Sequence, residues 1–322
     1  MRRAKSANDR RRTTPLSLFS SASAYSRQAA PPDMPHFRPL MLLANRLSSI
    51  QSILSFERWK GKGYHHFEDE QGIGRIAVLA TCLGMHLGVN IVLFLLVKLV
   101  QFGLIVIPPP ETTSSTTIQS LLHLFLSVES NTLQMTLQWT VYSIFLCLFH
   151  LGEFFSTCIY NPSVTTSDSF MINQSKAYTA AALISWIEFA IRIIFFPHKN
   201  SPQMFHVGIL LVTLGQTCRT LAMVTCGESF NHYIQRDKKD NHELVTNGIY
   251  SILRHPSYFG FYYWSIGTQM ILCNYFSTVV YGLAAWKFFH YRIPFEERTL
   301  RHHFGSAYDE YSSRTIVGIP FL

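Results

Sequence analysis

Long apolar runs separated by short polar segments occupy most of the chain from about residue 76 onward. Four of these runs cover about 76–100, 135–157, 178–196 and 204–225. Each is near the roughly 20 residues that a helix needs to cross the hydrocarbon core of a bilayer. Pro197 ends the third run, because proline cannot continue a helix without losing a hydrogen bond. The pattern predicts four membrane-spanning helices.

The last apolar run is too long for one crossing. It covers 258–291 and would reach roughly 51 Å as a helix at 1.5 Å per residue. That length fits two short spans with a turn near Asn274, so we predict a C-terminal helical hairpin and six spans in total. Residues 40–56 are amphipathic and predict an interfacial helix, although a pair of spans there would make eight. The apolar piece at 118–128 is too short to cross.

The composition agrees with this pattern. Hydrophobic residues make up 48% of the 322 residues and charged residues 14%, whereas a typical soluble domain is about 25% charged. The predicted fold class is therefore an all-α integral membrane protein with about six transmembrane helices (six to eight).

The net charge of +8 is concentrated at the N-terminus. Residues 1–39 hold eight Lys or Arg and two Asp, and so contribute six of the eight net positive charges. Such a segment can bind nucleic acid, but beside membrane spans it is better explained by Lys and Arg staying on the cytosolic side. With six spans, the basic segments Arg236–Arg254 and Arg292–Arg314 share that side. We expect both termini in the cytosol and no nucleic-acid partner; a mitochondrial presequence in the Ser- and Arg-rich tail is an alternative.

Four regions follow from these patterns. We predict a disordered basic tail at 1–39, an interfacial linker at 40–74, the first transmembrane helices at 75–230, and a catalytic region at 231–322 with the hairpin and a cytosolic C-terminal helix. The glycosylation sequon that begins at Asn173 would lie in the cytosol and stay unmodified.

Several common chemistries lack their motifs. "GKGYHH" and "GIGRIA" miss the third glycine of a dinucleotide fingerprint, and H-E-x-x-H, G-x-S-x-G and Walker motifs are absent. Adjacent histidines, as in His302–His303, point to different faces of a helix, so we expect no metal site. The cysteines form no Cys-x-x-Cys pair, which argues against zinc and a disulfide framework and predicts buried free thiols; they are Cys82, Cys147, Cys158, Cys218, Cys226 and Cys273.

Polar residues gather in four segments around the hairpin: "NHYIQ" (231–235), "NHELVTNGIY" (241–250), "RHPSY" (254–258) and "YRIPFEERTL" (291–300). Pro256 suits the first turn of a helix, whose positive end would offer the free N–H groups of Ser257 and Tyr258 to a carboxylate. Arg292 and Glu296 share a helical face if the helix continues past Pro294. A new helix starting at Pro294 would leave them close but unpaired.

Ionisable residues also occur inside the predicted spans. Glu188 and Arg192 are four residues apart in the third span, and Glu153 and Arg219 lie in the second and fourth. Charged groups at such depth are functional by default, but a structural ion pair is an equally good interpretation of each pair.

Several of these blocks, in order, resemble one family. "NHYIQ…NHELVTNGIYSILRHPSYFGFYYWSIGTQ…LCN", followed by "RIPFEERTLRHHFGSAYDEY", is similar to isoprenylcysteine carboxyl methyltransferases. "EFFSTCIYNPSVTTSDSFMINQSKAYTAAALISWIEF" (153–189) resembles the upstream region of the same family. The resemblance covers about 150–322. One departure is "IPF", which follows Arg292 where family members tend to be acidic.

The resemblance implies an endoplasmic reticulum enzyme that transfers a methyl group from S-adenosylmethionine to the C-terminal carboxylate of prenylated proteins after CaaX cleavage. The substrate carries a farnesyl or geranylgeranyl chain, and the sequence does not decide which, nor the oligomeric state. By position, Arg292 would meet the substrate, and Arg292 and Glu296 would be the catalytic residues. A helical cofactor pocket on the cytosolic face would comprise Gln235, His242, Glu243, Leu244, Val245, Tyr250, His255, Pro256, Ser257, Tyr258 and Glu296.

The implied chemistry suits this residue set. A C-terminal carboxylate has a pKa near 3.5 and is ionised at neutral pH, so the reaction requires no general base. An anion and a sulfonium cation would give two neutral products, which a dry site favours, and Arg292 would orient one carboxylate oxygen.

Two alternatives remain open. Phospholipid N-methyltransferases and sterol reductases also carry an Arg-His-x-x-Tyr-x-Gly pattern before a terminal hairpin. A non-enzymatic scaffold or transporter could share the spans, although transporters tend to show internal repeats and none is visible here.

Overall fold

The computed structural model describes residues 72–104, 130–172, 175–232 and 243–322. Several predictions fall outside these residues: the basic tail, the interfacial helix at 40–56, the apolar piece at 118–128, and the candidate residues Asn173, Gln235 and His242.

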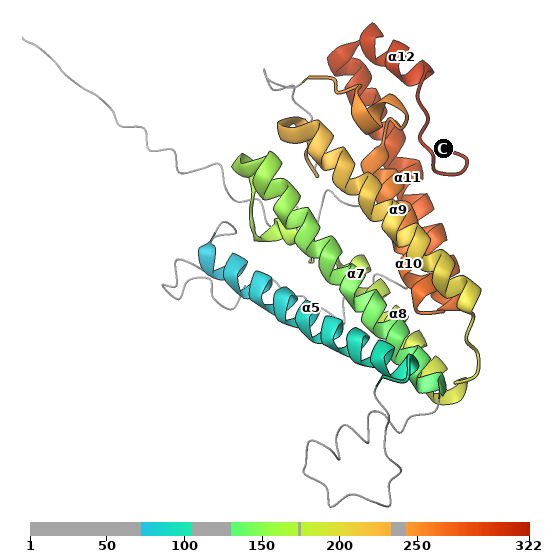
Figure 1. Ribbon diagram of the computed structural model, residues 1–322. Coiled ribbons are helices and arrows are strands. Elements are labelled where there is room, and N and C mark those ends of the chain that lie inside the picture. The colour runs from blue at the N-terminus through green and yellow to red at the C-terminus, as the bar shows by residue number, and fades with distance from the viewer. Residues whose placement is uncertain (1–71, 105–129, 173–174, 233–242) are drawn as a thin grey trace, which may run out of the picture.

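The described chain folds into long helices that lie side by side (Figure 1). Each of the six predicted spans corresponds to one helix, so these segments are confirmed as helical. The long helices are α5 (Ile73–Gln101), α7 (Ser130–Tyr160), α8 (Lys176–Phe195), α9 (Pro202–Cys226), α10 (Pro256–Ile271) and α11 (Tyr275–Phe304). The shorter elements are η4 (Pro162–Val164), η5 (Ser167–Phe170), η6 (Gly227–Ser229), η7 (Gly248–Ser251) and α12 (Ser306–Ser313).

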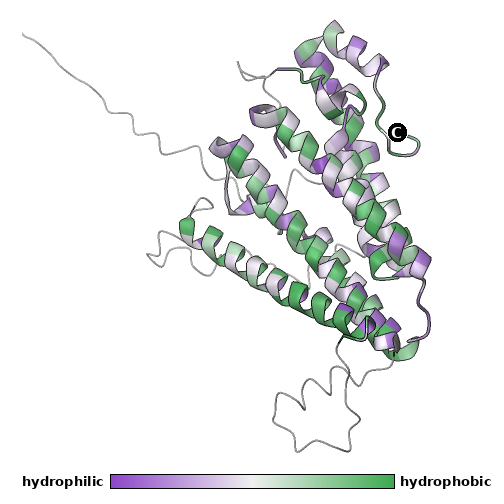
Figure 2. Ribbon diagram, viewed as in Figure 1, coloured by the Kyte–Doolittle hydropathy of each residue, from purple (hydrophilic) through white to green (hydrophobic). Residues whose placement is uncertain are grey.

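Four of the described helices, α5, α7, α8 and α9 extended through η6, are long and apolar enough to cross a membrane. Large apolar side chains such as Leu95, Ile187 and Leu210 are exposed on their outer surfaces, and Figure 2 shows hydrophobic residues along the length of these helices. Exposed apolar surface of this extent is typical of contact with another apolar phase. The described chain is therefore an all-helical membrane protein.

Two helices begin at serine caps. The side chain of Ser175 accepts a hydrogen bond from the N–H of Tyr178 at the start of α8, and the side chain of Ser201 accepts one from Met204 at the start of α9. Such caps satisfy donors that have no partner within a helix. Pro202 follows at the first position of α9, where its missing N–H costs nothing.

Glycines let α9 and α10 approach very closely. A Cβ atom on Gly215 would lie 2.5 Å from the carbonyl oxygen of Gly260, and a Cβ on Gly260 would lie 2.5 Å from the carbonyl oxygen of Gly215. One heptad away, a Cβ on Gly267 would lie 2.8 Å from the carbonyl oxygen of Gly208. Small residues at such positions are typical of tightly packed membrane helices. This contact fixes the position of α10, whose first turn carries the candidate site.

The hairpin turns where the sequence predicts, with Asn274 as the cap of α11. Arg192 and Glu188 hold this turn but form no ion pair with each other among the described residues. Arg192 Nη2 donates to the carbonyl oxygen of Leu272 (2.9 Å) and to Gln138 Oε1 (2.6 Å). Glu188 accepts hydrogen bonds from the first N–H groups of α11. Of the two interpretations left open by the sequence, an ion pair between Glu188 and Arg192 is therefore not observed, because each side chain binds backbone groups of the turn.

The chain after α12 folds back onto the hairpin. Leu253 and Ile316 form an isolated parallel β-bridge, and Trp286 Nε1 donates to the carbonyl oxygen of Pro320 (2.9 Å). Val317 and Ile319 are buried against α10 and α11. The C-terminal residues therefore pack against the segment that precedes α10 and fix its position.

The prediction of buried thiols is only partly right. All six cysteines are free, but Cys82 on α5 and Cys158 on α7 are exposed.

Candidate active site

The site begins at the N-terminus of α10. His255 is the cap residue and Pro256 the first residue of the helix, as predicted. The N–H of Tyr258 donates to the carbonyl oxygen of His255 (3.0 Å), so the predicted free N–H at this position is not present. The side chain of Ser257 also has a partner, because its Oγ accepts a hydrogen bond from Arg219 Nη1 (3.0 Å).

Arg292 and Glu296 meet through a tyrosine. The helix α11 continues through Pro294, which places both residues on one face and excludes a new helix starting at Pro294. The hydroxyl of Tyr258 accepts from Arg292 Nε (2.8 Å) and donates to Glu296 Oε2 (2.5 Å). The ring of His255 stacks on that of Tyr258 with 5.5 Å between centroids. Three of the predicted site residues therefore form one chain of hydrogen bonds.

The guanidinium of Arg292 is held by a backbone oxygen and two aromatic rings, and no carboxylate of the described residues pairs with it. Its Nη2 donates to the carbonyl oxygen of His232 (2.7 Å), and its plane lies over the rings of Tyr258 and Phe288, 5.4 and 5.6 Å from their centroids. No carboxylate of the described residues forms a direct ion pair with it, and its Nη1 group makes no hydrogen bond to them. A half-buried cation with one uncommitted donor group is suited to an anionic ligand.

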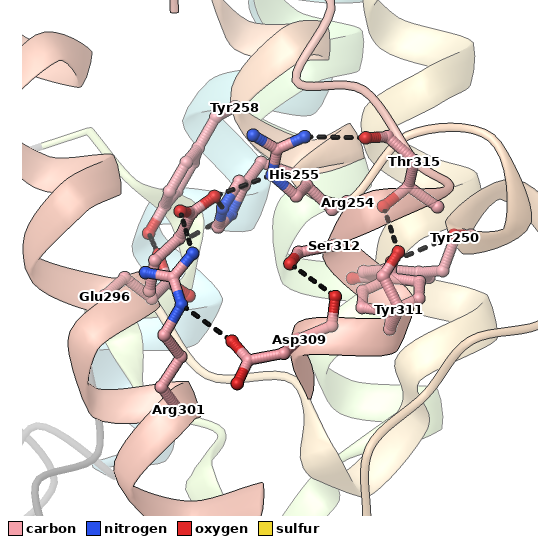
Figure 3. A network of polar contacts seen from close by, with 11 residues as sticks. Tyr250, Arg254, His255, Tyr258, Glu296, Arg301, Asp309, Tyr311, Ser312 and Thr315 are labelled. Carbon is pink, nitrogen blue, oxygen red and sulfur yellow. Dashed lines mark hydrogen bonds and ion pairs between the residues drawn. The ribbon is translucent and has the colours of Figure 1, made fainter. Parts of the chain in front are cut away.

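A second polar cluster, built on Arg254 and Glu297, lies next to these hydrogen bonds. Neither residue was among the site residues predicted from the sequence. Arg254 Nε pairs with Glu297 Oε1 (2.6 Å) and Arg254 Nη1 donates to the carbonyl oxygen of Thr315 (2.7 Å). Glu297 also approaches His255 Nε2 (3.4 Å) and Arg301 Nη2 (3.3 Å). Figure 3 shows the hydrogen bond from Arg254 to Thr315. The signal for this cluster was available, since Arg254 opens "RHPSY" and Glu297 follows Glu296 directly.

A buried ion pair between α7 and α9 contacts the start of α10, where the site lies. Glu153 on α7 and Arg219 on α9 are 1% and 5% exposed, and Arg219 binds both carboxylate oxygens, at 2.5 and 2.8 Å. Glu153 Oε2 also lies 3.0 Å from His232 Nε2. Of the two interpretations left open by the sequence, an ion pair is the observed one, and it joins α7, α9 and the start of α10.

The remaining predicted cofactor residues lie in the segment that enters the site. Glu243, Leu244 and Val245 precede η7, and their side chains make no hydrogen bond or ion pair with the described residues of the Arg292–Tyr258–Glu296 chain. Tyr250 turns toward the end of α9, and its carbonyl oxygen accepts from the hydroxyl of Tyr311 (2.9 Å). Among the predicted cofactor residues, His255, Ser257 and Tyr258 therefore lie at the Arg292–Tyr258–Glu296 hydrogen bonds. The side chains of residues 243–245 do not bond to them.

Glu297 makes the stability of this end of the protein depend on pH. It lies past the apolar part of α11. Burial alone would raise its pKa, but the hydrogen bonds from His255 and Arg254 outweigh burial and lower the pKa from 4.5 to about 2. A lowered pKa contributes stability above the unfolded value, and this contribution is lost as pH falls from 4.5 toward 2. At full effect it amounts to about 3 kcal/mol.

We therefore expect Glu297→Gln to lower the melting temperature in detergent at pH 6. Its melting temperature should then fall less than that of the wild type between pH 6 and pH 3.5. Glu310→Gln, which removes an exposed carboxylate on α12, is the control and should follow the wild type. Parallel curves for wild type and Glu297→Gln would contradict the assignment.

The chain matches known proteins across this region. The model of the isoprenylcysteine carboxyl methyltransferase family matches residues 207–302. Protein-S-isoprenylcysteine O-methyltransferase from Rattus norvegicus is 45% identical over 188 residues, which are 57% of this chain and 66% of the rat protein. The match thus spans slightly less than two thirds of that relative. The Dictyostelium discoideum protein of the same name is 43% identical over 180 residues, 56% of this chain and 76% of the relative.

A solved structure agrees with these matches. It is described as a eukaryotic intramembrane Ras methyltransferase, isoprenylcysteine carboxyl methyltransferase. The two structures superpose with a TM-score of 0.58 at 31% sequence identity, and the match covers 75% of this chain and 97% of the other. With 43% identity over 76% of one curated relative and this common fold, the chain belongs to the isoprenylcysteine carboxyl methyltransferase family.

Proposed function

We propose that this protein transfers a methyl group from S-adenosylmethionine to the C-terminal carboxylate of a prenylated cysteine, giving a methyl ester. The observation that carries the proposal is the state of Arg292. Its guanidinium is held by Tyr258 and His232, has no carboxylate partner among the described residues, and keeps Nη1 for a ligand. A carboxylate substrate is the anion that this arrangement accommodates best.

Arg292 and Glu296 take different roles in this proposal. Arg292 binds one oxygen of the substrate carboxylate and leaves the other free to attack. Glu296 accepts from Tyr258 through Oε2, and its Oε1 makes no hydrogen bond to the described residues. It can therefore accept from the ammonium or ribose hydroxyl groups of S-adenosylmethionine.

The donor set near the start of α10 fits this cofactor. S-adenosylmethionine supplies the methyl group as an electrophilic sulfonium. Glu296 offers a carboxylate to the cationic cofactor, and Tyr258 donates to Glu296 Oε2 and so orients that carboxylate. The proposed cofactor set also includes Tyr250, Pro256 and Ser257, the segment 243–245, and the sequence-predicted Gln235 and His242.

The proposed reaction requires little proton chemistry from the chain. The substrate carboxylate is already ionised at neutral pH. The negative charge of the carboxylate and the positive charge of the sulfonium disappear together in the products, so a site from which water is excluded favours the transition state. The contribution of the protein is to hold the two reactants in line and close together.

The membrane setting completes the proposal. Helices α10 and α11, the latter over residues 275–291, would cross as a hairpin and make six spans with both termini in the cytosol. The site then lies at the cytosolic face, with the prenyl chain entering from lipid between helices. Farnesylated or geranylgeranylated CaaX proteins at the endoplasmic reticulum are the proposed substrates.

The test uses membranes that contain the full chain, labelled S-adenosylmethionine and N-acetyl-S-farnesylcysteine. We expect a base-labile labelled ester, and none with N-acetylcysteine, which has no prenyl chain. Label in derivatives of phosphatidylethanolamine in place of the ester would instead indicate a lipid methyltransferase.

A further inference from the structure

The carbonyl oxygen that holds Arg292 belongs to a residue that is itself anchored deep in the bundle. His232 accepts from Arg292 Nη2 through its backbone oxygen (2.7 Å). Its side chain contacts another helix, where Nε2 lies 3.0 Å from Glu153 Oε2. One residue therefore connects the candidate substrate-binding arginine to a carboxylate on α7.

Glu153 is fixed independently of that contact. Its carboxylate is 1% exposed and is gripped at both oxygens by Arg219. A deeply buried charge pair with two hydrogen bonds is a fixed anchor, because moving either partner would leave a charge without its partner away from water. The ring of His232 is consequently attached to a fixed point.

The same anchor reaches the other side of Arg292. Arg219 Nη1 donates to Ser257 Oγ (3.0 Å), and Ser257 precedes Tyr258, whose hydroxyl accepts from Arg292 Nε. Two routes thus leave the Glu153–Arg219 pair, one through His232 and one through the start of α10. Both end at the guanidinium of Arg292.

We propose that His232, anchored by Glu153, is a positioning residue that holds the guanidinium of Arg292 in its binding orientation. It acts through its backbone oxygen and does not touch the reacting atoms. Its role in catalysis rests on the proposed function, whereas its hold on Arg292 does not.

The first test measures the hold directly. Phenylglyoxal modifies accessible arginine side chains, and peptide mass spectrometry reports the rate at each site. In His232→Ala the modification of Arg292 should become at least threefold faster than in the wild type. His232→Gln, which keeps a donor for Glu153, should restore most of the protection. Arg254, held by Glu297 and Thr315, serves as the internal control and should react at an unchanged rate.

Two results would overturn the proposal. An unchanged rate at Arg292 in His232→Ala would mean that His232 does not hold it. Faster reaction at Arg254 as well as at Arg292 would mean that the variant loosens the whole site, which is a general structural effect. Neither readout depends on enzyme activity.

The second test is kinetic. His232→Ala should raise KM for N-acetyl-S-farnesylcysteine about tenfold while the Kd of S-adenosylmethionine changes less than threefold, and His232→Gln should recover most of the loss. Ester formation by the wild type with no change of KM in His232→Ala would contradict the positioning role and leave the proposed function standing. Absence of ester in the wild type would instead remove the proposed function, and the modification rates would still decide whether His232 holds Arg292.

Discussion

Arg292→Ala should lower kcat/KM for a prenylcysteine acceptor by at least about 100-fold, or about 2.7 kcal/mol of transition-state stabilisation. The guanidinium is the group that meets the substrate carboxylate in this account, and a misplaced carboxylate loses the alignment that speeds the transfer. The affinity for S-adenosylmethionine should change little. Arg292 contacts Tyr258 and His232 and makes no direct contact with Glu296, the carboxylate proposed to bind the cofactor.

Two further variants sharpen this prediction. Arg292→Lys keeps the charge but loses the planar guanidinium that donates to both Tyr258 and His232. Its activity should therefore lie between those of the wild type and Arg292→Ala. Arg298→Ala removes an exposed arginine from the same helix, one that stacks on Phe295, and should match the wild type. Assays of initial rate against acceptor concentration decide the matter, and a value for Arg292→Ala within threefold of the wild type would exclude the proposed role.

Gly260→Ala should separate α9 from α10 and destroy the site. The added Cβ would lie 2.5 Å from the carbonyl oxygen of Gly215 and 2.8 Å from the backbone nitrogen of Arg219. Ordinary overpacking costs about 1–3 kcal/mol, and here the colliding atoms are backbone atoms that cannot rotate away. The movement would also displace Arg219 from Ser257, so activity should fall further than stability alone explains.

A thermal unfolding series in detergent, read together with ester formation, measures both effects. Gly88→Ala on α5 is the matched control, because a Cβ there meets nothing within 4 Å. It should melt at or above the wild-type temperature, as alanine favours the helix. Similar melting of Gly260→Ala and the wild type would show that the two helices are not in such close contact.

The helices were predictable because each needs about 20 apolar residues in a row, and the runs that end at Pro197 and turn at Asn274 are clear in the sequence. The close contact of α9 and α10 was not, since glycines at 208, 215, 260 and 267 acquire their meaning only when the two helices are paired. The path of α11 through Pro294 was also undecided. Proline can either begin a helix or lie within one, and packing against the rest of the hairpin decides.

The site was predictable where the motif is local. "RHPSY" places His255, Pro256 and Tyr258 within one turn, and the helix begins at Pro256 as predicted, although the N–H of Tyr258 is not free. The partners supplied by distant segments were not predictable: Thr315 reaches Arg254 across 61 residues, and Glu153 reaches His232 across 79. Pairings over such separations depend on tertiary folding, which also gave Glu188 and Arg192 separate partners at the hairpin turn.

The most direct test of the central claim is a crystal structure of this protein with S-adenosylhomocysteine and N-acetyl-S-farnesylcysteine. The account predicts a carboxylate oxygen of the farnesylcysteine within about 3 Å of the Arg292 guanidinium, the cofactor product against Glu296 and Tyr258, and the farnesyl chain directed between helices toward lipid. A carboxylate bound away from Arg292, with the cofactor product at another end of the bundle, would contradict it.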